Sequence, residues 1–245
     1  MQKRAFIIHL TRATGRKRFA DELLRACPIE ADIVEGVDGS ELAQGEIDKV
    51  YRRGLFRPEY PFRLRPAEIG CFMSHRKCWR LIAEGGLDYG LVFEDDAALD
   101  PDIAGPAMEF AENHIVEAGY IQMPVRNVPD GAVLSSESAG IQLMSPKVTP
   151  LRLSGQLISR AAATRLLEVT ETFDRPADTL LQMHWVTGIR PLVLAPSGLS
   201  DHTEAAGGST IASGKTIFER FSREIRRYAY RRKIEQLSHR HQAPA

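Results

Sequence analysis

The chain has few cysteines and no long apolar segment. Its cysteines, Cys27, Cys71 and Cys78, are odd in number and include no C-x-x-C pair. This pattern argues against a disulfide framework or a zinc site and favours a reducing compartment. The apolar run at residues 5–10 is too short for the core of a signal peptide, and no stretch approaches the length of a membrane-spanning helix. We therefore expect a cytoplasmic protein.

The chain also lacks a surplus of charge of either sign. Its 32 Lys and Arg residues balance 32 Asp and Glu residues, so the formal net charge is zero. Bulk electrostatic binding to nucleic acid needs a basic surplus, and we expect no nucleic-acid partner. With 245 residues of ordinary globular composition, the chain is long enough to bury a core.

Apolar runs alternate with helical patterns through most of the chain, which predicts an α/β domain. Ser40 and Ser159 are expected helix caps, and Pro66 suits a first helical turn. The expected strands cover residues 5–10, 32–35, 89–93, 120–123 and 189–194. The expected helices cover residues 40–50, 66–84, 102–118 and 159–167, with shorter ones around residue 19 and after residue 176. Residues 124–150 give only turn signals or a hairpin.

The last forty residues differ in character from the rest, so we expect residues 1–205 to form the main domain and 206–245 an appendage. Residues 198–214 are rich in Gly and Ser, which predicts a mobile loop. Residues 215–245 hold nine Lys or Arg against three Glu, and Phe218, Phe221, Ile225 and Tyr228 recur at helical spacing. This pattern predicts a basic amphipathic helix. It either docks on the domain with a solvated basic face or attaches to an anionic membrane surface at the inner face of the plasma membrane.

Three adjacent carboxylates, Glu94-Asp95-Asp96, follow the apolar strand at 89–93. Adjacent carboxylates repel one another, and a hard divalent cation such as Mg²⁺ or Mn²⁺ would resolve the repulsion. Strand alternation would put Glu94 and Asp96 on one face, where one could hold a metal and the other a ribose hydroxyl. The alternative is a solvated acidic turn, and the same motif also serves phosphotransferases and nucleases.

Two further segments carry polar groups next to predicted elements. Arg12 and Arg16 follow the first strand, where basic groups could neutralise a diphosphate or simply begin a solvated helix. Ser74 and His75 are neighbours within the helix at 66–84, so they point in different directions and do not form a Ser–His nucleophilic pair. Gly70 is costly inside that helix, which indicates close approach of another backbone or a ligand.

The order of these motifs resembles glycosyltransferase family 25, which includes bacterial lipooligosaccharide galactosyltransferases and collagen galactosyltransferases. The resemblance covers roughly residues 5–211. It rests on these segments: His9-Leu10-Thr11-Arg12 with Arg16, where His9 replaces the usual Asn; Val37-Asp38-Gly39; residues 68–75 with Trp79; residues 91–97; residues 154–162, with Gln156 near the place of a common aromatic; Pro176-Ala177-Asp178; and, loosely, residues 208–211. The G-C-x-x-S-H helix followed by E-D-D is the most specific of these features.

The resemblance implies a GT-A-like nucleotide-diphospho-sugar transferase fold, with a mixed, mostly parallel sheet flanked by helices. It implies inverting transfer of a hexose, typically galactose from UDP-galactose, to an oligosaccharide or lipid-linked glycan acceptor in lipopolysaccharide or surface polysaccharide synthesis. It assigns donor binding to Leu10, Arg12, Arg16, Ser74, His75, Glu94 and Asp95.

The resemblance also implies a divalent metal, Mn²⁺ or Mg²⁺, on Asp96 and Asp95, with His202 as a further ligand or else a solvent-exposed side chain. Asp178 is the candidate catalytic base, with simple helix capping as the alternative. Two other functions remain open from the residues themselves. One is a Mg²⁺-dependent phosphoester hydrolase, and the other is a non-catalytic, membrane-associated binding protein of the same fold.

Overall fold

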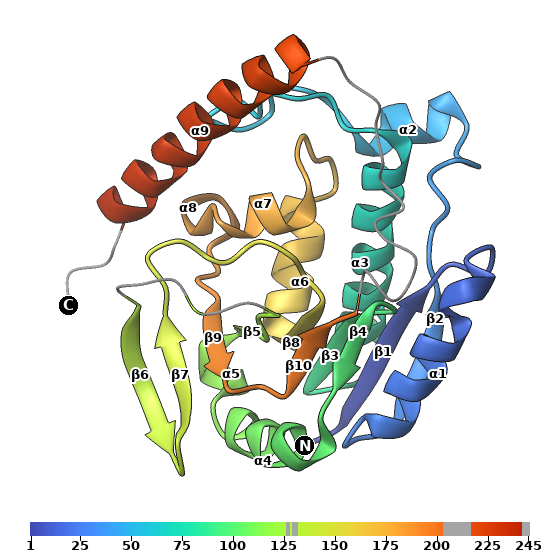
Figure 1. Cartoon of the computed structure of the whole chain (residues 1–245), viewed down its shortest axis with the longest axis vertical. Coiled ribbons are helices and arrows are strands. Elements are labelled where there is room, and N and C mark those ends of the chain that lie inside the picture. Colours follow the sequence, from blue (N-terminus) through green and yellow to red (C-terminus); the bar gives the residue numbers. More distant parts are fainter. Residues whose placement is uncertain (126–127, 129–131, 203–216, 242–245) are drawn as a thin grey trace.

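A computed structural model describes residues 1–125, 128, 132–202 and 217–241, with only the backbone described for 217–222. Its centre is an eight-stranded sheet (Figure 1). The strands follow the order β2 (Ala31–Glu35), β1 (Lys3–His9), β3 (Tyr89–Glu94), β8 (Gly155–Ser159), β5 (Tyr120–Gln122), β9 (Leu192–Ala195), β7 (Ile141–Ser145) and β6 (Val133–Ser138).

The sheet is mixed, and most of its strands run the same way. β1 pairs in parallel with β2 and β3, and β5 pairs in parallel with β9. β8 runs antiparallel between β3 and β5, and β7 runs antiparallel between β9 and β6. Only β7 and β8 therefore oppose the other six strands. The predicted mixed, mostly parallel sheet flanked by helices is confirmed.

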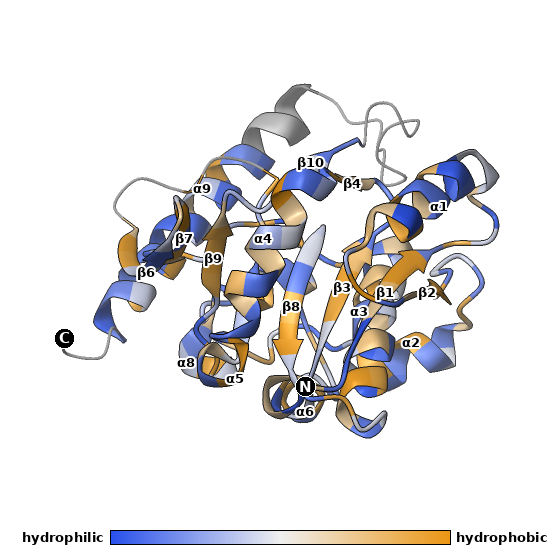
Figure 2. Ribbon diagram, turned by 90° about the horizontal axis from the view of Figure 1, so that it is seen from below, coloured by the Kyte–Doolittle hydropathy of each residue, from blue (hydrophilic) through white to orange (hydrophobic). Residues whose placement is uncertain are grey.

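Successive side chains of the central strands point to opposite sides of the sheet, so both faces carry apolar side chains. Helices cover both of these faces. Val92 of β3 joins the buried cluster under α3 (Pro66–Glu84) and α6 (Arg160–Val169). Leu91 and Phe93 join the cluster under α1 (Lys17–Ala26), α4 (Pro101–Glu112) and α5 (Ile115–Ala118). Figure 2 shows the apolar colouring of the sheet strands between the two helix layers. The smaller elements are the 3-10 helix η1 (Thr14–Arg16), α2 (Gln44–Val50), α7 (Ala177–Leu181), α8 (His184–Thr187) and the antiparallel pair β4 (Ala97–Leu99) with β10 (Leu199–Asp201).

Local signals explain where several helices begin. Pro66 opens α3, and the Glu68 carboxylate accepts a hydrogen bond from the Arg65 backbone N–H at 2.7 Å. The Ser159 hydroxyl caps α6, as predicted. Ser40 does not cap α2: its backbone N–H donates to Asp38 in a tight turn, and α2 begins four residues later than expected. The predicted helix at 102–118 is two helices, α4 and α5.

The C-terminal helix α9 (Ile217–Arg240) docks on the domain against α8 and the loop around Tyr60 (Figure 1). Among its side chains at residues 223–240, the buried ones are Tyr230, Ile234 and Ser238, which recur every four residues. The predicted apolar stripe is therefore wrong for Ile225 and Tyr228, which are 55% and 67% exposed. Phe218, Phe221 and most of the predicted loop at 198–214 lie outside the described residues or side chains. None of the described helices is long and apolar enough to cross a bilayer.

Candidate active site

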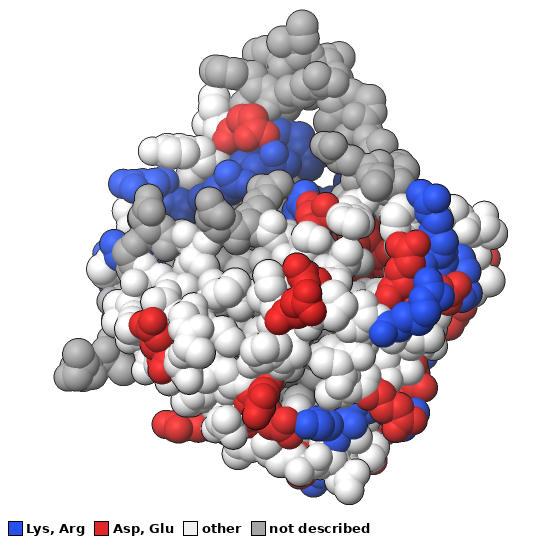
Figure 3. Space-filling model, turned by 60° about the horizontal axis from the view of Figure 1, so that its bottom comes forward, with Lys and Arg blue, Asp and Glu red and all other residues white. Residues whose placement is uncertain are grey.

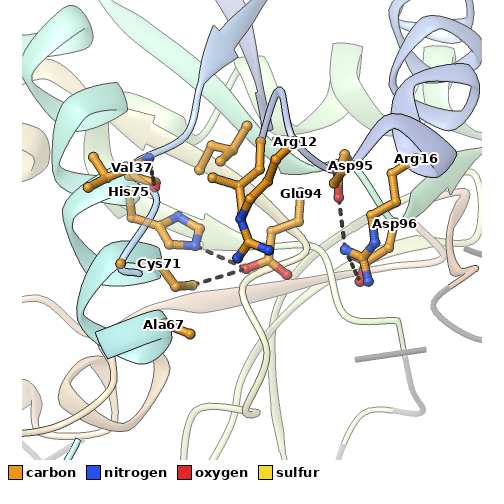
Figure 4. Close-up of a pocket in the computed structure, with 14 residues that line it drawn as sticks. Arg12, Arg16, Val37, Ala67, Cys71, His75, Glu94, Asp95 and Asp96 are labelled. Carbon is orange, nitrogen blue, oxygen red and sulfur yellow. Dashed lines mark hydrogen bonds and ion pairs between the residues drawn. The ribbon is translucent and has the colours of Figure 1, made fainter. Parts of the chain in front are cut away.

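The candidate site is a cleft at the carboxyl ends of β1 and β3, where ligands bind in open α/β sheets. The cleft encloses about 870 Å³, solvent-open space included. Its walls come from the end of β1, the turn at 37–39, α3 and the acidic triplet (Figure 4). It gathers many of the predicted site residues: Leu10, Arg12, Arg16, Ser74, His75, Glu94, Asp95 and Asp96. Their roles stay predictions.

Helix α3 forms one wall of the cleft because Gly70 and Gly39, which have no side chain, let its backbone pack directly against the backbone of the turn at 37–39. A Cβ atom on Gly70 would lie 2.5 Å from the Val37 carbonyl oxygen, and one on Gly39 would overlap the Pro66 carbonyl. The predicted close approach at Gly70 is thus confirmed, and the approaching group is the backbone of the turn at 37–39. The buried Ser74 hydroxyl also holds this turn, since it accepts a hydrogen bond from the Val37 N–H at 2.8 Å.

The acidic triplet is neutralised by side chains of the protein itself. β3 ends at Glu94, so strand alternation does not extend to Asp96, although both residues line the cleft. Asp95 is buried, and its two oxygens lie 2.8 Å from His9 Nδ1 and 3.0 Å from Arg16 Nη1. The same Arg16 nitrogen lies 3.5 Å from Asp96. Carboxylate repulsion alone therefore does not require a metal, and Asp95 positions Arg16 at the edge of the cleft.

A buried relay of hydrogen bonds ends on Glu94. The Tyr120 hydroxyl donates to Gln156 Oε1 at 2.7 Å, and Gln156 Nε2 donates to the Leu153 carbonyl at 2.9 Å. Because that carbonyl can only accept, the orientation of the Gln156 amide is fixed. Gln156 Nε2 also lies 3.1 Å from His75 Nδ1, which must accept. The His75 proton is thus on Nε2, which donates to Glu94 Oε1 at 3.1 Å.

This relay governs the charge of Glu94. Partial burial alone would raise the pKa of Glu94, but the hydrogen bond from His75 and the nearby guanidinium groups of Arg16 and Arg152 lower it below its usual value. Glu94 is therefore an ionised carboxylate facing the cleft.

A candidate metal-binding cluster is formed by Cys71, His75 and Glu94, with ligand atoms within 4.8 Å of one another. The relay places a proton on His75 Nε2, and a thiolate at Cys71 would stand against the Glu94 carboxylate, to which the thiol instead donates. This set does not fit a hard cation. Carboxylate oxygens are the ligands that Mn²⁺ and Mg²⁺ prefer, and Glu94 and Asp96 both offer them along the cleft.

A second cleft adjoins the first and shares four of its lining residues, Cys71, His75, Glu94 and Asp96. Asp178 lies in this second cleft. Its Oδ2 accepts from the Arg152 N–H at 3.1 Å, and its Oδ1 accepts from the Thr179 N–H at 2.6 Å. Burial raises the pKa of Asp178, while these hydrogen bonds oppose the rise. Asp178 is the second residue of α7 and does not occupy the capping position, which is held by Pro176.

Some site residues were placed differently or were missed. His202 lines neither cleft: its backbone N–H donates to the Asp96 carbonyl at 2.8 Å, and its exposed ring lies edge-on to Phe19. Sequence reasoning missed Arg227 and Arg231 of α9, which line the second cleft. The basic tail was their only signal. The sequence also carried no sign of the role of Gln156, which stood out only because the family commonly has an aromatic residue near this position.

Comparisons with known proteins agree with these motifs. The model for "Glycosyltransferase family 25 (LPS biosynthesis protein)" matches residues 2–130. Human procollagen galactosyltransferase 2 is 32% identical over 114 residues, which cover 44% of this chain and 18% of that protein. A Drosophila melanogaster glycosyltransferase 25 family member is 34% identical over 101 residues, covering 40% of this chain and 16% of that one. The match thus spans less than a fifth of these relatives' length.

A solved structure of S. aureus TarS 1-349 has a TM-score of 0.48 and 13% identity, covering 84% of this chain and 62% of that one. The family model spans more than half of the chain, from β1 through the G-C-x-x-S-H helix and the acidic triplet. The protein therefore belongs to glycosyltransferase family 25.

Proposed function

We propose that the protein is an inverting, metal-dependent glycosyltransferase. It moves a hexose, galactose by preference, from its UDP form to an oligosaccharide or lipid-linked glycan in lipopolysaccharide or surface polysaccharide synthesis at the cytoplasmic face of a membrane. Family membership and relatives named galactosyltransferases support the reaction type. The observation that carries the proposal is the junction of two clefts at Glu94 and Asp96, with basic groups on one side and Asp178 on the other.

The first cleft is the proposed donor site. Arg12 and Arg16 enter it from the end of β1, where guanidinium groups can bind a diphosphate (Figure 4). Arg16 is held by Asp95 and Arg12 by Asp38, so both are positioned before a ligand arrives. Asp96 and Glu94 would hold the divalent cation. When bound, that cation would offset the negative charge that builds on the departing diphosphate.

The second cleft is the proposed acceptor site. An acceptor hydroxyl there attacks the anomeric carbon on the face opposite the diphosphate. The new C–O bond forms as the bond to the phosphate oxygen breaks, and the diphosphate leaves with the electron pair. The Asp178 carboxylate takes the hydroxyl proton. Each of its oxygens already accepts hydrogen bonds from Arg152 or Thr179, but a carboxylate has further lone pairs for the acceptor.

The test is a transfer assay that follows UDP release from UDP-galactose, together with donor binding. Asp178→Asn is expected to keep donor binding and to lose turnover by a factor on the order of 10²–10⁴. Asp96→Ala is expected to lose both metal-dependent donor binding and turnover. Glu84→Gln, at an exposed position at the end of α3, is the matched control.

The two other functions predict different results. A phosphoester hydrolase would release phosphate from phosphoester substrates and would place no sugar on an acceptor. For a non-catalytic binding protein, the Asp96→Ala variant would bind the ligand as well as the wild-type protein does. Either result would replace the transferase proposal.

A further inference from the structure

We propose that the acceptor carries an anionic group, a phosphate or a carboxylate, and that Arg231 and Arg227 of α9 bind it. The inference rests on the proposed function, because it takes the second cleft as the acceptor site. Arg227 and Arg231 are four residues apart and therefore lie on one face of the helix, and both line that cleft. The C-terminal helix thus supplies part of the binding site.

Helix α9 is held firmly next to these two arginines. Tyr230, the neighbour of Arg231, accepts a hydrogen bond from the fully buried Arg175 at 2.7 Å. Arg175 also donates to the carbonyls of Phe56 and Pro58, each at 3.1 Å, and pairs with the buried Asp174. A helix fixed in this way holds its two arginines over the cleft, so that binding orders only their side chains and not the helix backbone.

The second cleft is lined by charged side chains of both signs. Its carboxylates are Glu68, Glu94, Asp96 and Asp178, and its cations are Arg152, Arg227 and Arg231. Arg152 pairs with Asp201, and Arg227 pairs with the exposed Glu224 of its own helix at 2.5 Å. In the described part of the chain, Arg231 forms no ion pair with a carboxylate. Lys and Arg side chains gather in a band over α9 in Figure 3.

A neutral sugar would leave this cation without a counterion, whereas a phosphate or carboxylate would pair with it. Guanidinium groups bind such anions through charge-assisted hydrogen bonds with two parallel donors. The donor diphosphate does not fill this role, because the first cleft has its own arginines, Arg12 and Arg16. The second cleft also contains Asp178, the proposed base for the acceptor hydroxyl. An anion bound in this cleft is therefore part of the acceptor.

A membrane surface is the competing partner for a basic helix, and geometry disfavours it for these two residues. Arg227 is half-buried and Arg231 is exposed, and both line the cleft, whereas the exposed Arg226 and Tyr228 of the same helix do not line it. The cleft arginines and the outward arginines of the same helix can therefore be tested separately. Arg226→Gln is the matched control for Arg231→Gln, since it removes the same charge five residues away.

The experiment measures binding of glucose 6-phosphate and of glucose to the whole 245-residue chain saturated with UDP and Mn²⁺, which keeps the probes out of the proposed donor cleft. Wild-type protein is expected to bind the phosphorylated sugar more tightly. Arg231→Gln should weaken that binding by about tenfold or more, since hydrogen bonds to charged groups are strong. Arg227→Gln should weaken it less, because Glu224 already offsets that charge. Arg226→Gln should bind like wild type, and circular dichroism checks that all variants are folded.

Three outcomes would overturn the inference. One is equal affinity of the wild-type protein for both sugars, and another is unchanged phosphate binding by Arg231→Gln. The third is a loss confined to sedimentation with vesicles of phosphatidylglycerol and phosphatidylcholine, which would assign Arg231 to a membrane. Binding of UDP-galactose separates this from the proposed function: if the protein does not bind this donor, with or without Mn²⁺, while glucose 6-phosphate binding still depends on Arg231, the transferase proposal fails and the anion site stands.

Discussion

Replacing Gln156 with leucine should both destabilise the protein and release His75. The Gln156 amide serves three buried groups: the Tyr120 hydroxyl, the Leu153 carbonyl and His75 Nδ1. A leucine side chain has similar bulk and no polar atom, so all three groups would lose their partner. Each such loss costs about 1–3 kcal/mol, and we expect Gln156→Leu to lower the free energy of unfolding by about 3 kcal/mol or more. That is a large part of the stability of an ordinary domain.

The assay is urea unfolding followed by circular dichroism, with Tyr120→Phe as the smaller perturbation. Tyr120→Phe removes only the hydroxyl that donates to Gln156 Oε1, and should cost about 1 kcal/mol. Added to Gln156→Leu, it should cost almost nothing more, because the bond is already lost. Gln156→Leu should also slow transfer, since His75 can then adopt the other tautomer and stop donating to Glu94. The relay would be refuted if the two substitutions proved additive or if Gln156→Leu unfolded at the wild-type urea concentration.

Two further substitutions and a pH profile test separate parts of the structure. Gly70→Ala would place a Cβ atom 2.5 Å from a backbone carbonyl oxygen of the neighbouring turn. It should therefore lower the melting temperature and weaken nucleotide binding. The control is Gly105→Ala in α4, where a Cβ atom would meet nothing within 4 Å and should be neutral or stabilise the protein by up to about 1 kcal/mol. Arg175→Met would leave the buried Asp174 carboxylate without its cation and should cost about 3–5 kcal/mol in chemical denaturation, and a value near zero would contradict the ion pair. Burial raises the pKa of Asp178, and a catalytic base works only when it is deprotonated. The value of log(kcat/KM) should therefore fall as the pH drops through a pKa that lies above the ordinary aspartate value. If the fall at low pH instead occurs at the ordinary aspartate pKa, Asp178 is not the base.

Local signals were sufficient to predict the elements that frame the first cleft. Pro66 and the glycines at 85–86 bound α3, and an apolar run directly before three carboxylates marks β3. The sequence did not predict the central strand β8 for two reasons. The strand is buried on both faces, so its residues do not alternate between apolar and polar. In addition, a glycine and a glutamine interrupt its apolar run. Its neighbours in the sheet come from distant parts of the sequence.

Contacts between distant residues limited the prediction of the site. The sequence placed His75 on a helix, where a lone histidine has no visible partner. The structure pairs it with Gln156, 81 residues away, and with Glu94. In the same way, the four-residue spacing that docks α9 through Tyr230 and Ile234 competes in the sequence with a second apolar spacing through Ile225 and Tyr228. Only the tertiary partners of the helix decide between them.

The buried guanidinium of Arg175 also has a consequence for how the chain is made. It lies among Asp174, the carbonyls at positions 56 and 58, and the Tyr230 hydroxyl. A ribosome delivers the first three of these groups well before position 230, so the nascent domain holds this charge with an incomplete set of partners until α9 has been made. Helix α9 therefore completes a buried polar centre begun some 170 residues earlier, and Arg227 and Arg231 join the wall of the second cleft only after this helix has been made.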